Sequence, residues 1–323
     1  MEQNIFQLKE SDFEGFALDL FQIHYRHNST YRQYCDYRKI VGEKVQSIKD
    51  IPFLPIDTFK SHTVQLNRFE AEITFESSGT TANTSSKHFV KKLSIYEKSF
   101  KTAFENFYGK AEDYCILALL PSYLERGGSS LVYMAEKLIQ QSKHKQSGFY
   151  LNNHQTLYET LNELAKKGQK TLLIGVSFAL LDFAERYKVN HPNLIVMETG
   201  GMKGRRKEII REELHEILCN SFQLGSIHSE YGMTELLSQA YSKGNGKFYA
   251  PQWMKVLARK QDDPFSYANF GETAALNIVD LANIYSCPFI QTDDLGKVYA
   301  DGSFEVLGRF DRATVRGCNL MVR

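Results

Sequence analysis

The sequence lacks several features that would place it in common functional classes. Its five cysteines are scattered without a C-x-x-C pair, which argues against a disulfide framework or a zinc ribbon. No apolar stretch approaches the roughly 20 residues of a membrane-spanning helix, and charged residues precede the first apolar run, so no signal peptide is visible. The 39 Lys and Arg residues nearly balance the 38 Asp and Glu residues, which gives no electrostatic footprint for nucleic acid or an anionic membrane. We therefore expect a cytoplasmic protein with reduced thiols, no nucleic-acid partner and no membrane insertion.

What the sequence does contain is a regular alternation of strand-like and helix-like segments. Its 323 residues are 42% hydrophobic and 13% aromatic, enough for a sizeable buried core. Continuous apolar runs predict strands at 114–120, 171–177 and 193–199, and apolar residues at helical spacing predict helices at 131–139, 155–166, 178–188 and 204–218. This alternation implies an α/β fold, in which layered parallel sheets are flanked by helices.

We expect one large domain over residues 1–323, because neither an internal repeat nor a long linker interrupts the chain. Within it, 1–60 form a helical N-terminal region and 61–220 form the α/β core. Residues 221–323 form a β-richer part, with short strands and Gly, Asn and Asp turns.

Two local patterns add predictions about helices. Ser94 followed by Glu97 predicts a capping box at the start of a helix. His24 and His27 are one helical turn apart, and with no third ligand nearby we expect a helix surface rather than a metal site.

The segment FESSGTTANTSSKHFV, residues 75–90, packs seven Ser and Thr residues around Gly79. It lies between a predicted strand, EITF, and the helix that begins near Ser94. A loop in this position can aim backbone N–H groups and hydroxyls at one anion, and Gly79 permits a tight turn. An ordinary polar loop is the alternative interpretation.

Four further segments carry residues suited to a binding site. ETGGMKGRRKE (198–208) places two glycines after a strand and before a helix, where ligands bind in open α/β sheets. HSEYGMTELLSQ (228–239) lies at a strand-to-loop junction, and QTDDLGKV (291–298) and LGRFDRATVRGCNL (307–320) follow. Taken singly, each has a structural explanation as a glycine turn, a helix cap or a surface ion pair.

Together, and in this order, the segments resemble the core motifs of the adenylate-forming superfamily. SSGTT resembles its phosphate loop, EYGMTE its aromatic–Gly–x–Thr–Glu motif, TDDLG its Thr-Gly-Asp and GRFD its Gly-Arg-x-Asp. Within the superfamily, LLPSYLERGGSSLVYM, TGGMKGRRKE and RGCNL resemble the acyl-protein synthetase (LuxE-type) family, with phenylacetate–CoA ligases the next nearest. The resemblance covers most of the chain from about residue 50 and implies the large domain of these enzymes.

The resemblance implies a role for each matched position. Tyr231 would stack on adenine, Asp294 would accept the ribose hydroxyls, and Arg309 would pair with ribose or phosphate. Glu235 would hold Mg²⁺ and the Ser/Thr loop would hold the phosphates of ATP. The nucleotide-binding residues are then Ser77, Ser78, Gly79, Thr80, Thr81, Lys87, Gly200, Gly201, Met202, Glu230, Tyr231, Gly232, Met233 and Asp294, and the catalytic residues are Cys318, Glu235, Thr234 and Arg309.

The sequence departs from the superfamily pattern at three places. Ala82 replaces the second loop glycine, and Asp293 replaces the middle glycine of Thr-Gly-Asp. The chain ends shortly after the Gly-Arg-x-Asp motif, so we expect no small C-terminal domain and no adenylation lysine, with Lys87 or a partner as the substitute cation. RGCNL resembles the segment that carries the acylated cysteine in acyl-protein synthetases, which makes Cys318 the predicted acyl acceptor. If that segment is extended, Arg316 shares a face with Cys318 and favours its thiolate.

The predicted function is activation of a fatty or aryl carboxylic acid with ATP and Mg²⁺, followed by acyl transfer to a protein thiol. An acyl-reductase or acyl-carrier protein is the partner that the resemblance implies. Two alternatives stay open: a CoA ligase, and a degenerate module that binds nucleotide without turnover. The aromatic-rich composition favours an apolar acyl or aryl group and does not name the acid.

Overall fold

The computed structural model describes residues 2, 4–77, 85–120, 128–151, 153–200, 209–263 and 265–309. Contacts between Cα atoms divide the chain into two compact units: the first joins Met1–Glu70 to Gln252–Arg323, and the second is Ala71–Pro251. The prediction of one large domain with divisions near residues 60 and 220 stays a prediction.

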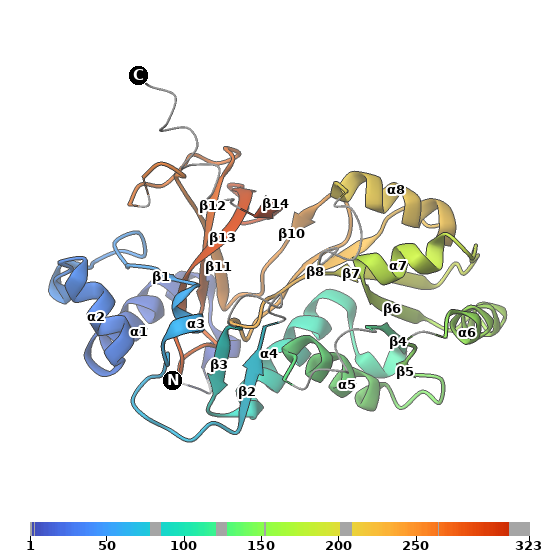
Figure 1. Ribbon diagram of the computed structural model, residues 1–323, viewed down its shortest axis with the longest axis horizontal. Helices are drawn as coiled ribbons and strands as arrows, with labels where there is room; N and C mark the ends of the chain where they lie inside the picture. The colour runs from blue at the N-terminus through green and yellow to red at the C-terminus, as the bar shows by residue number, and fades with distance from the viewer. Residues whose placement is uncertain are drawn as a thin grey trace. The chain divides into compact units, whose positions relative to one another are not determined.

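The second unit is built on a mostly parallel sheet (Figure 1). In spatial order its strands are β5 (Gly148–Phe149), β4 (Cys115–Leu119), β6 (Thr171–Val176), β7 (Leu194–Thr199), β8 (His228–Tyr231) and β9 (Ala240–Ser242). Only the pairing of β8 with β9 is antiparallel. Every residue of β4 and β6 is buried, as expected for continuous apolar runs covered on both faces. The predicted α/β class and the three predicted strands are confirmed.

Helices cover both faces of this sheet: α4 and α5 lie on one side and α7 and α8 on the other (Figure 1). The bounds are α4 Leu93–Tyr108, α5 Ser130–Ser142, α6 His154–Lys166, α7 Ser177–Ala184 and α8 Arg211–Phe222, with a 3₁₀ turn, η4, at Ala111–Asp113. Strands β2 (Ile73–Glu76) and β3 (Lys87–Val90) form an antiparallel pair, and β10 is Lys247–Phe248. Helices are present at the predicted places, but α7 ends at Ala184 rather than at 188. Helix α8 begins at Arg211 and ends at Phe222 rather than running from 204 to 218, and residues 204–208 lie outside the described residues.

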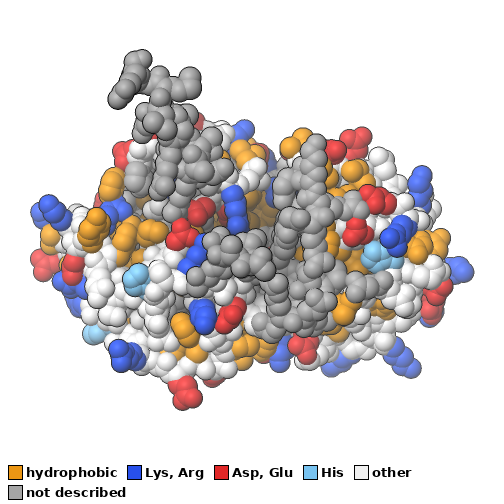
Figure 2. Space-filling model, in the orientation of Figure 1, with side chains coloured by type: hydrophobic (Ala, Val, Ile, Leu, Met, Phe, Trp, Pro, Cys, Tyr) orange, Lys and Arg blue, Asp and Glu red, His pale blue; other side chains and the backbone are white. Residues whose placement is uncertain are grey.

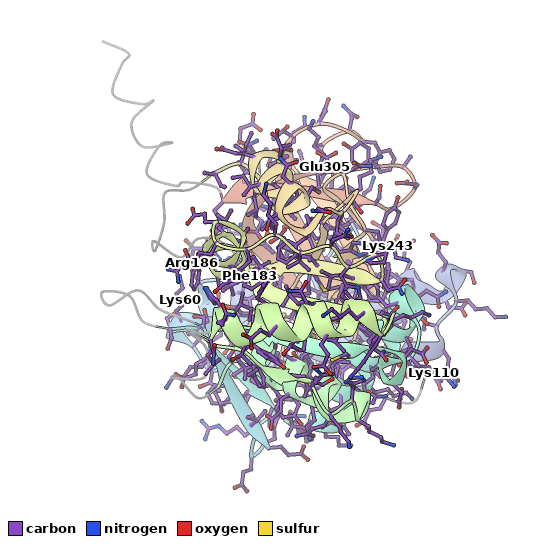
Figure 3. All side chains as sticks on the ribbon, turned by 90° about the vertical axis from the view of Figure 1, so that its right-hand side faces the viewer. Lys60, Lys110, Phe183, Arg186, Lys243 and Glu305 are labelled. Carbon is purple, nitrogen blue, oxygen red and sulfur yellow. The ribbon has the colours of Figure 1, made fainter. Side chains whose placement is uncertain are left out.

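Aromatic rings join α7 to its neighbours. Phe183, labelled in Figure 3, stacks on Phe222 of α8 at 5.6 Å with nearly parallel planes and contacts His154 of α6 edge-on at 5.8 Å. Tyr187, just past the end of α7, stacks on Tyr158 at 4.8 Å. Tyr187 therefore packs on α6 although helix α7 has already ended at Ala184.

The predicted capping box at Ser94 and Glu97 is wrong. Helix α4 begins at Leu93, and its N-cap residue is Lys92. The Lys92 side chain makes no capping hydrogen bond to the helix. Instead Glu72, which precedes β2, accepts the Leu93 N–H at 2.7 Å. Glu97 accepts the Tyr133 hydroxyl at 2.6 Å, so its carboxylate joins α4 to α5 and does not close the helix end.

The first unit combines short helices with an antiparallel sheet. Its helical elements are η1 (Ile5–Gln7), η2 (Glu10–Asp12), α1 (Phe13–His27), α2 (Ser29–Tyr37), η3 (Gly42–Lys44) and α3 (Thr58–Ser61). Strands β11 (Met254–Arg259), β12 (Ala274–Asp280), β13 (Phe289–Val298) and β14 (Phe304–Arg309) pair in chain order, and β1 (Leu54–Pro55) runs parallel to β13. The predicted β-richer C-terminal part corresponds to these strands.

The predicted surface position of His24 is wrong. Its side chain is fully buried on the inner face of α1, and its Nε2 lies 3.1 Å from the carbonyl oxygen of Ile284. Burial lowers the pKa of His24 to about 3, so the imidazole is neutral and packs as part of the core. Across the described ranges, no three His, Cys, Asp or Glu side chains are grouped as metal ligands would be.

The surface agrees with the balanced composition. Figure 2 shows acidic and basic side chains mixed over the described part of that face. In the part of the chain that the structure covers, every helix is too short or too polar to cross a bilayer.

Candidate functional site

Two predicted segments meet at the carboxyl edge of the parallel sheet in the second unit. Strands β7 and β8 are neighbours, so Gly200, just after β7, lies near the EYGMTE segment that ends β8. Thr199 and Glu230 are direct partners in this pairing, and the Thr199 hydroxyl donates to Glu230 Oε2 at 2.5 Å. The Ser177 hydroxyl, at the start of α7, donates to the Gly200 carbonyl at 2.7 Å. Ligands of open α/β sheets bind at this edge.

The pKa values of two buried carboxylates at this edge are shifted in opposite directions. Burial raises the pKa of Glu230 to about 7; the nearby charge of Glu198 adds to this effect, and the Thr199 hydrogen bond opposes it. Burial would also raise the pKa of Glu198, but hydrogen bonds from His215 and Ser229 and the charge of Arg211 lower it overall. Glu198 is therefore ionised near neutral pH, while Glu230 is close to half protonated.

Glu198 and its partners were not among the predicted site residues. Arg211 Nε lies 3.4 Å and His215 Nε2 lies 3.6 Å from Glu198 Oε1, both reaching it from α8. The Ser177 hydroxyl lies 3.3 Å from the other carboxylate oxygen. A signal was available in the sequence, because Glu198 is a charged residue inside a largely apolar predicted strand, two positions before Gly200.

The EYGMTE segment needs its glycine for a steric reason. A Cβ at Gly232 would lie 2.5 Å from Glu230 Oε1, and that carboxylate is held by Thr199. Tyr231 is buried and meets the Phe248 ring at 5.9 Å, nearly edge-on. The glycine therefore makes room for the acidic side chain two residues before it.

The end of the same motif contacts the strand that follows the Ser/Thr-rich segment. His88, buried on β3, lies with Nδ1 2.8 Å from the Thr234 carbonyl oxygen. Glu235 is 5% exposed, whereas Met233 and Thr234 are half-buried. His88 was not predicted as a site residue, yet it joins two predicted motifs.

The base of the Ser/Thr-rich hairpin is closed by Ser77. Its N–H donates to the Ser86 carbonyl at 3.1 Å, and its hydroxyl oxygen accepts the Ser86 N–H at 2.8 Å. Lys87, the predicted substitute cation, lies opposite Glu76 in the strand pair, with Nζ 3.7 Å from Oε1. The predicted residues Ser78, Gly79, Thr80, Thr81, Gly201, Met202 and Cys318 lie outside the described residues.

In the first unit, the structure brings Asp294 and Arg309 together. They are direct partners in the pairing of β13 with β14, and Arg309 Nε lies 3.8 Å from Asp294 Oδ1. The Asp294 side chain is 14% exposed and the Arg309 side chain 88%. An ion pair this exposed contributes little to stability, so the guanidinium can exchange it for a ligand at small cost.

The donor set fits Mg²⁺ better than a structural metal. Glu235 is a single buried carboxylate, and the described residues contain no group of three candidate ligands. Mg²⁺ is commonly bound by one or two carboxylates together with substrate phosphates and water. A site of this kind needs the nucleotide to complete it.

Comparison with known proteins agrees with the predicted resemblance. The family model described as "Acyl-protein synthetase, LuxE" matches residues 5–323. The long-chain-fatty-acid–luciferin-component ligase of Vibrio harveyi is 24% identical over 93% of this chain and 84% of its own length. The protein of the same name from Photorhabdus luminescens is 42% identical over 65 residues, 20% of this chain and 55% of its own. The predicted family is confirmed.

Solved structures share the fold at low sequence identity. An open conformation of 2-hydroxyisobutyryl-CoA ligase, in complex with 2-HIB-AMP and CoA, matches with a TM-score of 0.68 and 11% identity, over 92% of this chain and 74% of its own. ATP-bound MatB from Rhodopseudomonas palustris matches with a TM-score of 0.56 and 14% identity, over 75% of this chain. The chain spans about half, 49%, of the MatB structures that it matches.

Proposed function

Since the chain belongs to the acyl-protein synthetase (LuxE) family, we propose that it activates a carboxylic acid with ATP and passes the acyl group to a protein thiol. The family match over residues 5–323 carries this proposal. The Vibrio harveyi relative is named for a long-chain fatty acid, and a fatty acid is therefore the substrate class that we propose. We also propose a cytoplasmic location and an acyl-reductase or acyl-carrier protein as partner.

The proposed reaction has two steps. A carboxylate oxygen attacks the α-phosphorus of ATP, and the bond from this phosphorus to the oxygen shared with the β-phosphate breaks. Pyrophosphate departs and an acyl-adenylate is formed. A thiolate then attacks the acyl carbon, the bond to the adenylate oxygen breaks, and AMP leaves a thioester. Positioning the two reactants and stabilising charge at the α-phosphate are the main contributions expected of the protein.

The proposed nucleoside ligands are the residues that match the motifs of the family. Gly200, with Gly201 and Met202, would form the adenine slot, and Tyr231 would stack on the base. The hydrogen bond from Ser177 to the Gly200 carbonyl supports this assignment, because it fixes the backbone at the start of the slot. Asp294 would accept the ribose hydroxyls, with Arg309 beside it as a forked donor for ribose or phosphate.

The phosphates would be held by the 77–81 segment and Mg²⁺ by Glu235, next to Thr234. When bound, the ion neutralises negative charge on the phosphates. The contact of His88 with the Thr234 carbonyl supports this grouping, because it joins the strand after the phosphate segment to the metal-binding end of EYGMTE. Lys87 is our proposed cation for adenylation.

Cys318 is the proposed acyl acceptor. Cys35, Cys115 and Cys287 are buried and Cys219 is half-buried. Burial raises the pKa of all four thiols, to about 12 for Cys35 and about 11 for Cys115. Because the thiolate is the nucleophile, these four cysteines are poor acceptors at neutral pH.

Mass spectrometry of the intact protein after incubation with ATP, Mg²⁺ and a fatty-acid panel tests this function. We expect pyrophosphate release and a hydroxylamine-labile acyl adduct on Cys318. The Cys318→Ser variant should release pyrophosphate without forming the adduct. An adduct on another cysteine would refute the acceptor, acyl-CoA as the product would indicate a CoA ligase, and the absence of pyrophosphate with every acid would indicate a module without turnover.

A further inference from the structure

The Thr-Asp-Asp segment lies in a break of the β-ladder. In the pairing of β12 with β13, Asn277 faces Gln291 and Ala275 faces Leu295. One residue of β12, Leu276, therefore stands opposite three residues of β13, Thr292 to Asp294. A bulge of this kind interrupts the ladder and re-aims the side chains that follow it. The position of Asp294 thus depends on what holds the bulge.

Thr292 bridges the break from inside the sheet. It is fully buried, and its hydroxyl donates to the Leu276 carbonyl at 2.7 Å. The same oxygen accepts the Asp294 N–H at 3.1 Å. One side chain therefore satisfies the carbonyl that the ladder leaves open and ties down the backbone of Asp294.

A buried guanidinium donates a hydrogen bond to the main chain of Thr292. Arg259, the last residue of β11, is 8% exposed. Its Nη2 donates to the Thr292 carbonyl at 2.9 Å, and its Nε donates to Asn277 Oδ1 at 3.1 Å. The side chain thus reaches across β12 to the bulge in β13. The fixed fork of an arginine suits such a two-point contact.

An arginine is a costly residue to bury in a sheet, where an apolar side chain fills the same space without loss of hydration. Two hydrogen bonds of its side chain are directed at the bulge and at the β12 residue beside it, which is the place where the ladder is interrupted. The chain Arg259–Thr292–Asp294 therefore connects a buried cation to the backbone that presents the Asp294 carboxylate.

We infer that Arg259 is a positioning residue for nucleotide binding: it holds the Thr292–Asp294 bulge so that Asp294 faces the ribose hydroxyls. This inference rests on the proposed function, in which Asp294 accepts those hydroxyls. Arg259 touches no substrate atom in this role. Its effect reaches the nucleotide only through Asp294.

The test compares ATP with 2′,3′-dideoxy-ATP, which lacks both ribose hydroxyls, in the pyrophosphate-release assay. Arg259→Met keeps an unbranched apolar side chain and removes the guanidinium donors. We expect it to raise KM for ATP about tenfold, the scale of one lost charged hydrogen bond, with kcat nearly unchanged. With 2′,3′-dideoxy-ATP, Arg259→Met and the unmodified protein should have equal KM. Arg259→Lys should restore part of the loss, and Lys260→Met, an exposed neighbour, should change neither value.

Asp294→Ala separates this inference from the proposed function. Adding Arg259→Met to Asp294→Ala should cost nothing further, because the group that it positions is gone. Equal losses with the two nucleotides, or a full additional loss in the double variant, would overturn the inference and leave Arg259 a general stabiliser of the sheet. Unchanged ATP binding in Asp294→Ala alone would overturn the ribose role of Asp294 instead. If circular dichroism finds Arg259→Met unfolded, Arg259→Lys takes its place in the same comparisons.

Discussion

Replacing Glu230 by glutamine should stabilise the protein, and the gain should grow with pH. Glu230 is buried, and its pKa is about 7 in the folded chain against 4.5 without the fold. Below pH 4.5 the carboxyl is protonated in both states and burial carries no charge penalty. As pH rises from 4.5 through 7, the folded state must either keep the proton or bury a charge, so stability falls.

The magnitude follows from the two pKa values. A difference between 4.5 and about 7 corresponds to about 3 kcal/mol of stability lost at pH 8. Glutamine is neutral at every pH, and its amide oxygen can accept the Thr199 hydroxyl that Glu230 accepts now. At about 2.1 cal/mol/K per residue, the entropy of unfolding of a 323-residue chain converts this gain into roughly 4–5 °C in Tm.

Thermal denaturation followed by circular dichroism at pH 5, 6, 7 and 8 measures the effect. The Tm difference between Glu230→Gln and the unmodified protein should be small at pH 5 and largest at pH 8. Glu105→Gln, on the exposed face of α4, is the control for the same chemical change at the surface. A Glu230→Gln variant that is destabilised at pH 8, or whose Tm difference is the same at every pH, would refute the reasoning.

Three further predictions concern the proposed ligands and the sheet. Glu235→Gln should leave the fold intact, because the change is isosteric, but lower the rate of pyrophosphate release more than about 100-fold, as expected for one lost electrostatic contact. Thr80→Ala combined with Thr81→Ala should weaken ATP binding, measured by calorimetry, much more than AMP binding. Gly296→Ala should lower the free energy of unfolding, measured with urea, by about 3 kcal/mol, because its Cβ would overlap the Glu305 carbonyl oxygen. Gly15→Ala, in an open helical position, should instead add about 0.5–1 kcal/mol.

Each of these predictions has a contrary outcome. Unchanged pyrophosphate release would remove Glu235 from the metal site. Equal losses of ATP and AMP binding would mean that the 77–81 segment is structural or contacts the nucleoside. If Gly296→Ala unfolds at the same urea concentration as the unmodified protein, β13 and β14 tolerate a wider separation than their pairing implies.

The sequence predicts strands β4, β6 and β7 well because each is a continuous apolar run. Such a run can be recognised without knowing which elements pack beside it. The sequence predicts the N-terminal cap of helix α4 poorly, because the capping residue, Glu72, lies outside the helix in sequence. The same reason accounts for His24, whose partner Ile284 is 260 residues away in the chain. Single-segment patterns identify elements, whereas caps and buried polar contacts depend on which elements pack together.

The residues of the candidate site show the same difference between what single motifs predict and what depends on packing. Motif order identifies Glu230 and Asp294, which the structure sets at the end of β8 and in the bulge of β13. It does not identify Glu198, His88 or Arg259, because each acts on a motif from a different strand. Sequence motifs thus reveal the residues expected to touch the nucleotide, and the packing reveals those that hold them.

The Asp293 departure from the superfamily pattern is compatible with an intact site. A glycine is favoured where φ is positive and is required where a neighbour leaves no room for Cβ. Asp293 is not among the described non-glycine residues with positive φ, so its backbone is one that any L-residue adopts without strain. The position that does require glycine is Gly296, where a Cβ would overlap the Glu305 carbonyl oxygen of β14. Since that glycine is present, and Thr292 and Arg259 hold the bulge around Asp293, Asp294 keeps its place opposite Arg309. Asp293→Gly should therefore change KM for ATP by less than about twofold, whereas a gain of tenfold or more in affinity would show that the aspartate obstructs the nucleotide.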